Sequence, residues 1–161
     1  MRVLLAIDGS DHSEAAVDEI ARQHFSEDSE VRVISVVEPP HFPETISGVS
    51  GEGINMNLYL EIGKTVHEQA HAAVKKAAAR LRAGEESRKL SVMTKVLSGS
   101  PKRMILEEAE AFGADLIVVG SHGHGMLERF LLGSVSQAVA LHARCSVEIV
   151  RSPKTPTSES K

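Results

Sequence analysis

Short apolar runs alternate with amphipathic stretches along almost the whole chain. The apolar runs predict strands at residues 3–7, 31–37, 90–96, 115–120 and 147–150. Apolar residues at helical spacing predict helices between them, from Ser10 or Ser13 to His24, then over 58–83, 101–112 and 135–142. Because strands and helices alternate, we expect right-handed crossovers, a parallel sheet and helices on both of its faces.

The same pattern indicates where the sheet ends and where the chain is irregular. Apolar and mostly polar residues alternate over 90–96, which is typical of an edge strand with one exposed face. Residues 38–57 carry three prolines and three glycines, so we expect a flexible loop there. The polar residues 152–161 predict a disordered tail, which leaves a single domain over 1–151.

Composition narrows the class of protein. The chain has 161 residues, of which 42% are hydrophobic and 25% charged, enough for one domain with a real core. The net charge of -4 and the lack of a long basic run argue against a nucleic-acid partner. One cysteine excludes an internal disulfide and favours the reducing cytoplasm. The apolar run at residues 3–7 is too short for a membrane span or a signal-peptide core.

Parallel α/β sheets bind ligands outside the carboxyl ends of the strands, where the winding direction reverses. This rule points to Asp8, to residues 36–38 and to the glycine-rich segment 120–134. Glycines let a backbone approach an anion closely, and the N–H groups of Gly133, Ser134 and Val135 would direct their dipoles at negative charge. The hydroxyls of Ser134 and Ser136 would add donors. A turn that merely needs glycine is the alternative.

Familiar phosphate-binding fingerprints do not fit this segment. Gly120 and Gly125 have the spacing of a P-loop, but Met126 stands where the lysine belongs. Gly123-His124-Gly125 is followed by Glu128 where a dinucleotide fingerprint needs glycine. The segment therefore belongs to neither class.

The pattern Gly120-x2-Gly123-x9-Gly133-Ser134 resembles the ATP-binding signature of the universal stress protein family. The likeness extends over residues 3–10 and 113–120 and covers nearly the whole chain. It implies a Rossmann-like, doubly wound sheet of five parallel strands in the order 3-2-1-4-5. It also implies a homodimer paired through strand 5, with ATP in the crevice between strands 1 and 4.

The resemblance also implies roles for individual residues. Asp8 would contact the ribose, Val36 would offer backbone groups to adenine, and residues 120–136 would hold the phosphates, with Mg²⁺ as their usual companion. As a cap of the first helix, Asp8 would have a structural role that does not exclude this one. His122, His124 and Arg129 either neutralise phosphates or are simply solvated. The expected nucleotide-binding residues are Ala6, Asp8, Val36, Val37, Gly120, Ser121, His122, Gly123, Gly133, Ser134, Val135 and Ser136.

One residue of strand 5, Glu148, departs from the family pattern, and the single cysteine, Cys145, lies just before this strand. Glu148 interrupts strand 5, which is usually apolar, so its charge would face either the dimer seam or solvent. Cys145 is expected to be a small packed residue, because nothing in its neighbourhood argues for a depressed pKa.

A metal site is the competing interpretation. His67-Glu68-Gln69-Ala70-His71 is an H-E-x-x-H sequence on a predicted helix, the spacing that places two imidazoles on one face to bind zinc. Val74 and Ala77 stand where an extended metalloprotease motif needs glycine and histidine. The alternative is that the two histidines bind no metal and simply lie at the boundary of the helix face that packs on the sheet.

Three hypotheses about function follow. The first is an ATP-binding stress or signalling protein with an unknown downstream partner. Without a P-loop lysine or an evident base, any ATP hydrolysis should be slow. The second is an interaction module on the same fold that needs no nucleotide, and the third is the zinc hydrolase.

Overall fold

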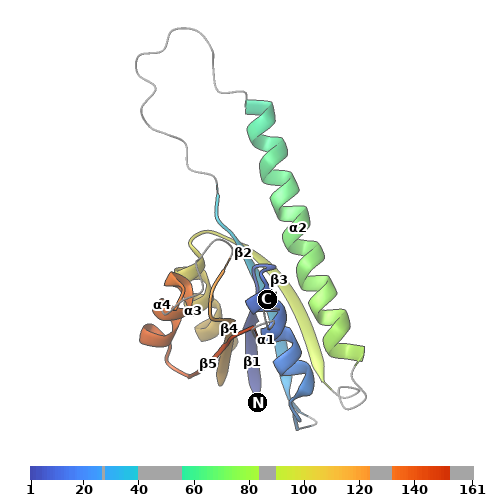
Figure 1. Cartoon of the computed structure of the whole chain (residues 1–161), viewed down its shortest axis with the longest axis vertical. Coiled ribbons are helices and arrows are strands. Elements are labelled where there is room, and N and C mark those ends of the chain that lie inside the picture. Colours follow the sequence, from blue (N-terminus) through green and yellow to red (C-terminus); the bar gives the residue numbers. More distant parts are fainter. Residues whose placement is uncertain (27, 40–55, 84–89, 124–131, 153–161) are drawn as a thin grey trace, which may run out of the picture.

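The computed structural model describes residues 1–26, 28–39, 56–83, 90–123 and 132–152. Its strands form one parallel sheet in the order β3-β2-β1-β4-β5 (Figure 1). This confirms the predicted strand order and places β3 at an edge, as its alternating pattern indicated. The strands are β1 (Arg2–Ala6), β2 (Glu30–Val37), β3 (Ser91–Ser98), β4 (Leu116–Gly120) and β5 (Ser146–Val150).

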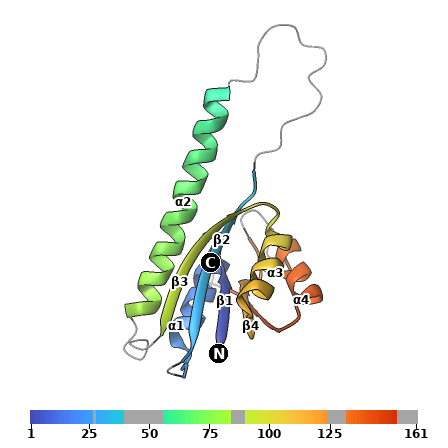
Figure 2. The ribbon, with the colours of Figure 1, turned by 180° about the vertical axis from the view of Figure 1, so that it is seen from behind.

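Helices cover both faces of the sheet, as predicted. They are α1 (Asp11–Arg22), α2 (Met56–Ala83), α3 (Pro101–Phe112) and α4 (Ser134–His142). Figures 1 and 2 show α1 and α2 on one side of the sheet, with α3 and α4 on the other. No helix among the described residues has both the length and the apolar character needed to cross a membrane.

The central strand β1 is buried on both of its faces. Val3 and Leu5 pack with α1 and α2, whereas Leu4 and Ala6 pack with α3 and α4. Val3, Leu4 and Leu5 are all 0% exposed. Two-sided burial explains why this strand is a continuous apolar run rather than an alternating one.

The long helix α2 differs from its prediction in two ways. It begins at Met56, so the last two residues of the predicted loop are helical, while 40–55 lie outside the described residues. Its apolar stripe packs on the sheet only from Ala70 onward. Ile62 and Val66 are 49% and 39% exposed, because the amino-terminal half of α2 extends past the sheet (Figure 1). The predicted tail lies outside the described residues except for Ser152.

The helix ends follow the expected local chemistry. Ser10 is the N-cap of α1, and its side chain accepts the Ser13 N–H. Asp8 therefore does not cap this helix. Pro101 occupies the first turn of α3, and Gly113 ends that helix in the left-handed conformation at φ 65°.

The winding reverses at β1. The chain first moves from β1 to β2 and β3, and then crosses back over β1 to β4 and β5. The loops that follow β1 and β4 consequently diverge at their carboxyl ends, which opens a crevice there.

Candidate functional site

A cavity of about 370 Å³ lies at the carboxyl ends of β1, β2 and β4. Apolar residues form one part of its wall and polar groups with three glycines form the other. The apolar part is Ala6, Ile7, Val36, Pro101, Ile105, Val119 and Val135. The polar part is Asp8, Ser13, Gly120, His122, Gly123, Gly133, Ser134 and Ser136. A cavity with one apolar and one polar part of its wall suits a ligand that has a flat base and an anionic tail.

Most of the predicted nucleotide-binding residues line this cavity, and two do not. Ser121 is 0% exposed and lies behind the wall, and Val37 is 5% exposed and absent from the lining. His124 and Arg129, named as possible phosphate partners, lie outside the described residues. The structure therefore brings together ten of the twelve predicted residues, from β1, β2, β4, α4 and the loops beside them, and leaves out Val37 and Ser121.

The backbone of Val36 faces the cavity side of β2. The β1–β2 ladder ends where the Ile7 N–H donates to the Ile34 carbonyl at 2.9 Å. Backbone groups alternate between the two sides of a strand, so Val36 faces β1 like Ile34, whereas the Val37 carbonyl accepts from Gly99 on the β3 side. Among the described residues, no backbone group of β1 or its loop pairs with the N–H and C=O of Val36. Val36 thus presents one donor and one acceptor at the cavity.

The Asp8 carboxylate is held at the end of β1. Its Oδ1 accepts the Ser10 N–H at 3.0 Å and the Ser10 hydroxyl at 2.6 Å. The Ser10 hydroxyl also lies 3.2 Å from the carbonyl oxygen of His122 in the loop after β4. These contacts place Asp8 between the first helix and the glycine-rich segment.

Hydrogen bonds of Ser121 join the loop after β4 to both β5 and the start of α4. The Ser121 N–H donates to the Val150 carbonyl at 2.7 Å, and the Ser121 carbonyl accepts the Gly133 N–H at 2.8 Å and the Ser136 hydroxyl at 2.9 Å. Two predicted phosphate donors, the Gly133 N–H and the Ser136 hydroxyl, are therefore already engaged within the protein. The predicted donors that remain are the Ser134 hydroxyl and the N–H groups of Ser134 and Val135 in the first turn of α4.

Two glycines in this region permit close approaches. A Cβ on Gly123 would lie 2.5 Å from Asp8 Oδ2, so a side chain there would displace the carboxylate. A Cβ on Gly120 would lie 2.8 Å from the backbone carbon of His12 in the first turn of α1. Gly120 thus needs glycine for packing against backbone, whereas a side chain at position 123 would require the Asp8 carboxylate to move.

A pair of histidines flanks the polar end of the cavity. The rings of His12 and His122 lie 5.2 Å apart between centroids, and only His122 lines the cavity. The backbone N–H of Ser152 donates to His12 Nδ1 at 2.8 Å, so this nitrogen acts as an acceptor. His12 therefore anchors the chain just after β5.

The sequence analysis missed several residues of the wall. Ser13 was considered only as a helix cap, and Pro101 and Ile105 only as parts of α3. Whether Pro101 and Ile105 reach the cavity depends on how α3 packs across the sheet, and no local sequence pattern encodes that packing. Ser13 had one available signal in the sequence, its place in the first turn of the helix that follows Asp8.

The H-E-x-x-H sequence is not arranged as a metal centre in the described residues. His67 Nδ1 lies 3.0 Å from the Gly63 carbonyl and its Nε2 lies 3.0 Å from Ser98 Oγ, so both ring nitrogens have partners. His71 is exposed. Within the described ranges, no group of three His, Cys, Asp or Glu side chains is close enough to hold a metal ion.

The two unusual residues near β5 have structural explanations. Glu148 faces α1, where Gln23 Nε2 donates to its carboxylate at 3.2 Å, so its charge points neither along the strand edge nor fully into solvent. Cys145 packs against the cluster beneath α3 and α4. Burial, together with the charge of Asp115, raises the pKa of the Cys145 thiol, which agrees with a packed and unreactive residue.

Comparison with known proteins gives a consistent result. Residues 1–151 match the model of the universal stress protein family. The chain is 36% identical over 153 residues to universal stress protein MJ0531 of Methanocaldococcus jannaschii, an alignment that covers 95% of this chain and 83% of that protein.

Solved structures share the fold. The structure of hypothetical protein MJ0577 superposes with a TM-score of 0.77 at 23% identity, covering 96% of this chain and 97% of that one. A universal stress protein in complex with cAMP has a TM-score of 0.65 at 24% identity, covering 95% and 98% of the two chains. A family protein from Arabidopsis thaliana with AMP bound has a TM-score of 0.62 at 17% identity, covering 98% and 97%.

Proposed function

This chain belongs to the universal stress protein family, and we propose that it is a member that binds ATP in the cavity at the carboxyl ends of β1, β2 and β4. The proposal is supported by the adenine nucleotides bound to two structural neighbours, AMP in one and cAMP in the other. The observation that carries it is the donor and acceptor pair of Val36 opposite the amino terminus of α4.

The backbone of Val36 has the right order of groups for adenine. An N–H can donate to adenine N1, and the neighbouring C=O can accept from the exocyclic amino group. Guanine presents the reverse order at this edge, a donor at N1 and an acceptor at O6, and would leave both contacts unmade. Pro101 and Ile105 form apolar wall beside this edge, against which a flat base can pack. We therefore expect selection of adenine over guanine.

The polar end of the cavity suits a ribose and phosphates. A carboxylate such as Asp8 accepts hydrogen bonds from vicinal hydroxyls of a ribose. The first turn of α4 directs the N–H groups of Ser134 and Val135, and the positive end of the helix dipole, toward an anion. Mg²⁺ would accompany a triphosphate by binding its oxygens and several waters.

Efficient catalysis is not part of this proposal. Among the described residues, no lysine or arginine lines the cavity. Rapid phosphoryl transfer needs such charges and a positioned water. We expect a binding protein whose ATP hydrolysis, where present, is slow, and whose response is read by a downstream partner.

The decisive experiment is a calorimetric titration of the protein with ATP and with GTP. We expect saturable binding of ATP and binding of GTP weaker by about tenfold or more, because a mismatched base leaves buried polar groups unpaired. Gly123→Val, whose side chain would displace Asp8, should lose ATP binding while circular dichroism shows a folded protein. Absence of ATP binding by the unaltered protein would favour the interaction module instead.

We propose two further properties, an oligomeric state and a cellular compartment. Within the described part of the chain β5 is an edge strand, which supports a homodimer paired through that strand. The single cysteine, with its raised pKa, suits the cytoplasm, where thiols stay reduced.

A further inference from the structure

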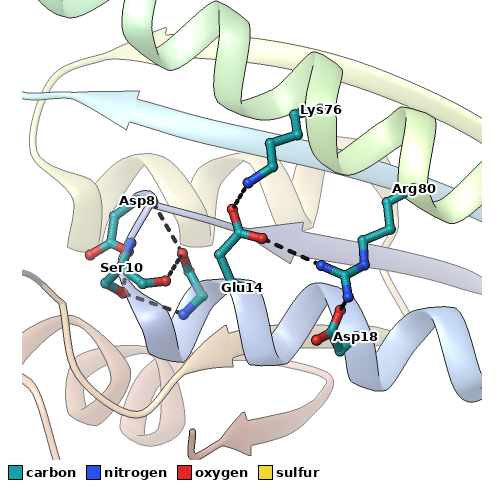
Figure 3. A network of polar contacts seen from close by, with 8 residues as sticks. Asp8, Ser10, Glu14, Asp18, Lys76 and Arg80 are labelled. Atoms are coloured by element: carbon teal, nitrogen blue, oxygen red, sulfur yellow. Dashed lines mark hydrogen bonds and ion pairs between the residues drawn. The ribbon is translucent and has the colours of Figure 1, made fainter.

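Ser10 lies behind the cavity and joins three parts of its wall. The residue is 6% exposed and is not in the cavity lining. Its hydroxyl lies 2.6 Å from Asp8 Oδ1 (Figure 3). The same hydroxyl lies 3.2 Å from the His122 carbonyl oxygen and accepts the Ser13 N–H at 3.3 Å. A single hydroxyl therefore connects the end of β1, the loop after β4 and the start of α1.

These contacts determine where the Asp8 carboxylate points. Because both the N–H and the hydroxyl of Ser10 donate to Oδ1, rotation of the carboxylate is restricted. The other oxygen, Oδ2, lies against Gly123, where a Cβ would approach to 2.5 Å. Asp8 and the loop at residues 122–123 consequently hold each other in one arrangement, with Ser10 contacting both.

We propose that Ser10 is a positioning residue of the nucleotide site, which orients Asp8 and the loop at residues 122–123 before the ligand binds. The inference rests on the proposed function, but it concerns a residue that does not line the cavity. Preorganisation raises affinity because the free protein does not have to order these groups on binding. Removing the hydroxyl should therefore weaken nucleotide binding without removing any direct contact.

Two substitutions separate positioning from helix capping. Ser10→Gly removes the hydroxyl but keeps a residue that caps helices nearly as well as serine. Ser10→Thr keeps the hydroxyl as both donor and acceptor. We expect ATP affinity to fall about tenfold in Ser10→Gly, the effect of one charge-assisted hydrogen bond, and to stay within about threefold of the unaltered protein in Ser10→Thr.

A matched control tests whether a weaker α1 would suffice to explain the loss. Ala15→Gly lowers the helix propensity of α1 without removing any hydrogen bond to Asp8 or His122, because alanine has no polar side chain, and it should leave ATP affinity unchanged. Equal losses in Ala15→Gly and Ser10→Gly would overturn the proposal, since they would reflect helix stability alone.

A double-mutant cycle then tests whether Ser10 acts through Asp8. In the Asp8→Ala background, Ser10→Gly should cause much less than its usual loss of affinity, because the carboxylate that Ser10 orients is gone. Full additivity of the two effects would contradict the inference. If the unaltered protein bound no ATP, the proposed function would fail first, whereas normal binding by Ser10→Gly would refute only the role of Ser10.

Discussion

At the scale of single residues, close backbone packing rather than turn geometry accounts for glycine at the end of β4. Gly120 lies against the first turn of α1, where an added Cβ would meet two backbone atoms, at 2.8 Å and 2.9 Å. Backbone atoms cannot rotate away as a flexible side chain can. Gly63 in α2 is the opposite case, since a Cβ there would meet nothing within 4 Å.

These two glycines should respond oppositely to alanine. Gly120→Ala should destabilise the protein by about 1–3 kcal/mol, because overpacking shifts α1 away from the sheet. Gly63→Ala should stabilise it by about 0.5–1 kcal/mol, because alanine has the higher helix propensity. Urea denaturation of both variants measures these free energies of unfolding. If both variants changed the free energy of unfolding only slightly, α1 would be able to shift away from residue 120 without destabilising the protein.

At the scale of elements, a buried carboxylate attaches α3 to the sheet. Glu108 is 5% exposed and pairs with Arg32 of β2 and Lys95 of β3, each at 2.6 Å. Burial raises the pKa of Glu108, but the hydrogen bonds and charges of Lys95 and Arg32 outweigh it and leave the pKa below its ordinary value of 4.5. Arg32 also lies 4.0 Å above the ring of Phe112. One acidic side chain thus connects two strands and a helix.

The lowered pKa predicts how stability depends on pH. The contribution of Glu108 is fully present above its unfolded pKa and is lost as the pH falls through its lower folded pKa. Glu108→Gln should therefore cost about 1–3 kcal/mol at neutral pH, since a hydrogen-bonded buried charge is removed.

Urea denaturation of both proteins at pH 7 and at pH 3 provides the measurement. The difference between them should shrink at the lower pH, which lies below the ordinary pKa of 4.5, because the unfolded chain then binds a proton at Glu108 and unfolding is favoured. A difference that stayed constant would mean that Glu108 contributes through packing and not through its charge.

At the scale of the whole molecule, β5 leaves one edge of the sheet open in the described part of the chain. The Ser146 N–H and the Val150 carbonyl are bonded on the β4 side. By alternation, the backbone groups of Val147 and Ile149 face outward. The charge of Glu148 was expected to face either the dimer seam or solvent, but its carboxylate instead accepts a hydrogen bond from Gln23, the residue that follows α1. The edge is therefore compatible with pairing to a second copy.

Proline at position 149 tests the proposed homodimer. Ile149→Pro removes an outward N–H and leaves the β4 ladder intact, which an edge strand tolerates. Ile149→Ala keeps the N–H and serves as the control for the lost side chain. Sedimentation velocity should find a dimer for the unaltered protein and the alanine variant, and a monomer for the proline variant. A proline variant that remained dimeric would place the interface elsewhere.

The fold could be predicted almost completely from sequence. Periodicity alone located the strands and helices, since β1 is apolar throughout and β3 alternates, as a central and an edge strand do. The glycine spacing from Gly120 to Ser134 indicated the family, and most of the residues inferred from it line one cavity. The errors were local. Ile62 and Val66 continue an apolar stripe past the edge of the sheet, and a stripe does not tell how far its partner surface extends.

What the sequence determined by itself was therefore the order of elements, which local periodicity encodes, and the set of residues near the crevice, which the resemblance to a known family implied. Only the tertiary structure decided which groups remain available there. It engaged the Gly133 N–H and the Ser136 hydroxyl within the protein, directed the backbone of Val36 rather than Val37 to the cavity, and placed Ser10 behind Asp8. Hydrogen-bond partners distant in sequence make these choices, and no local pattern records them.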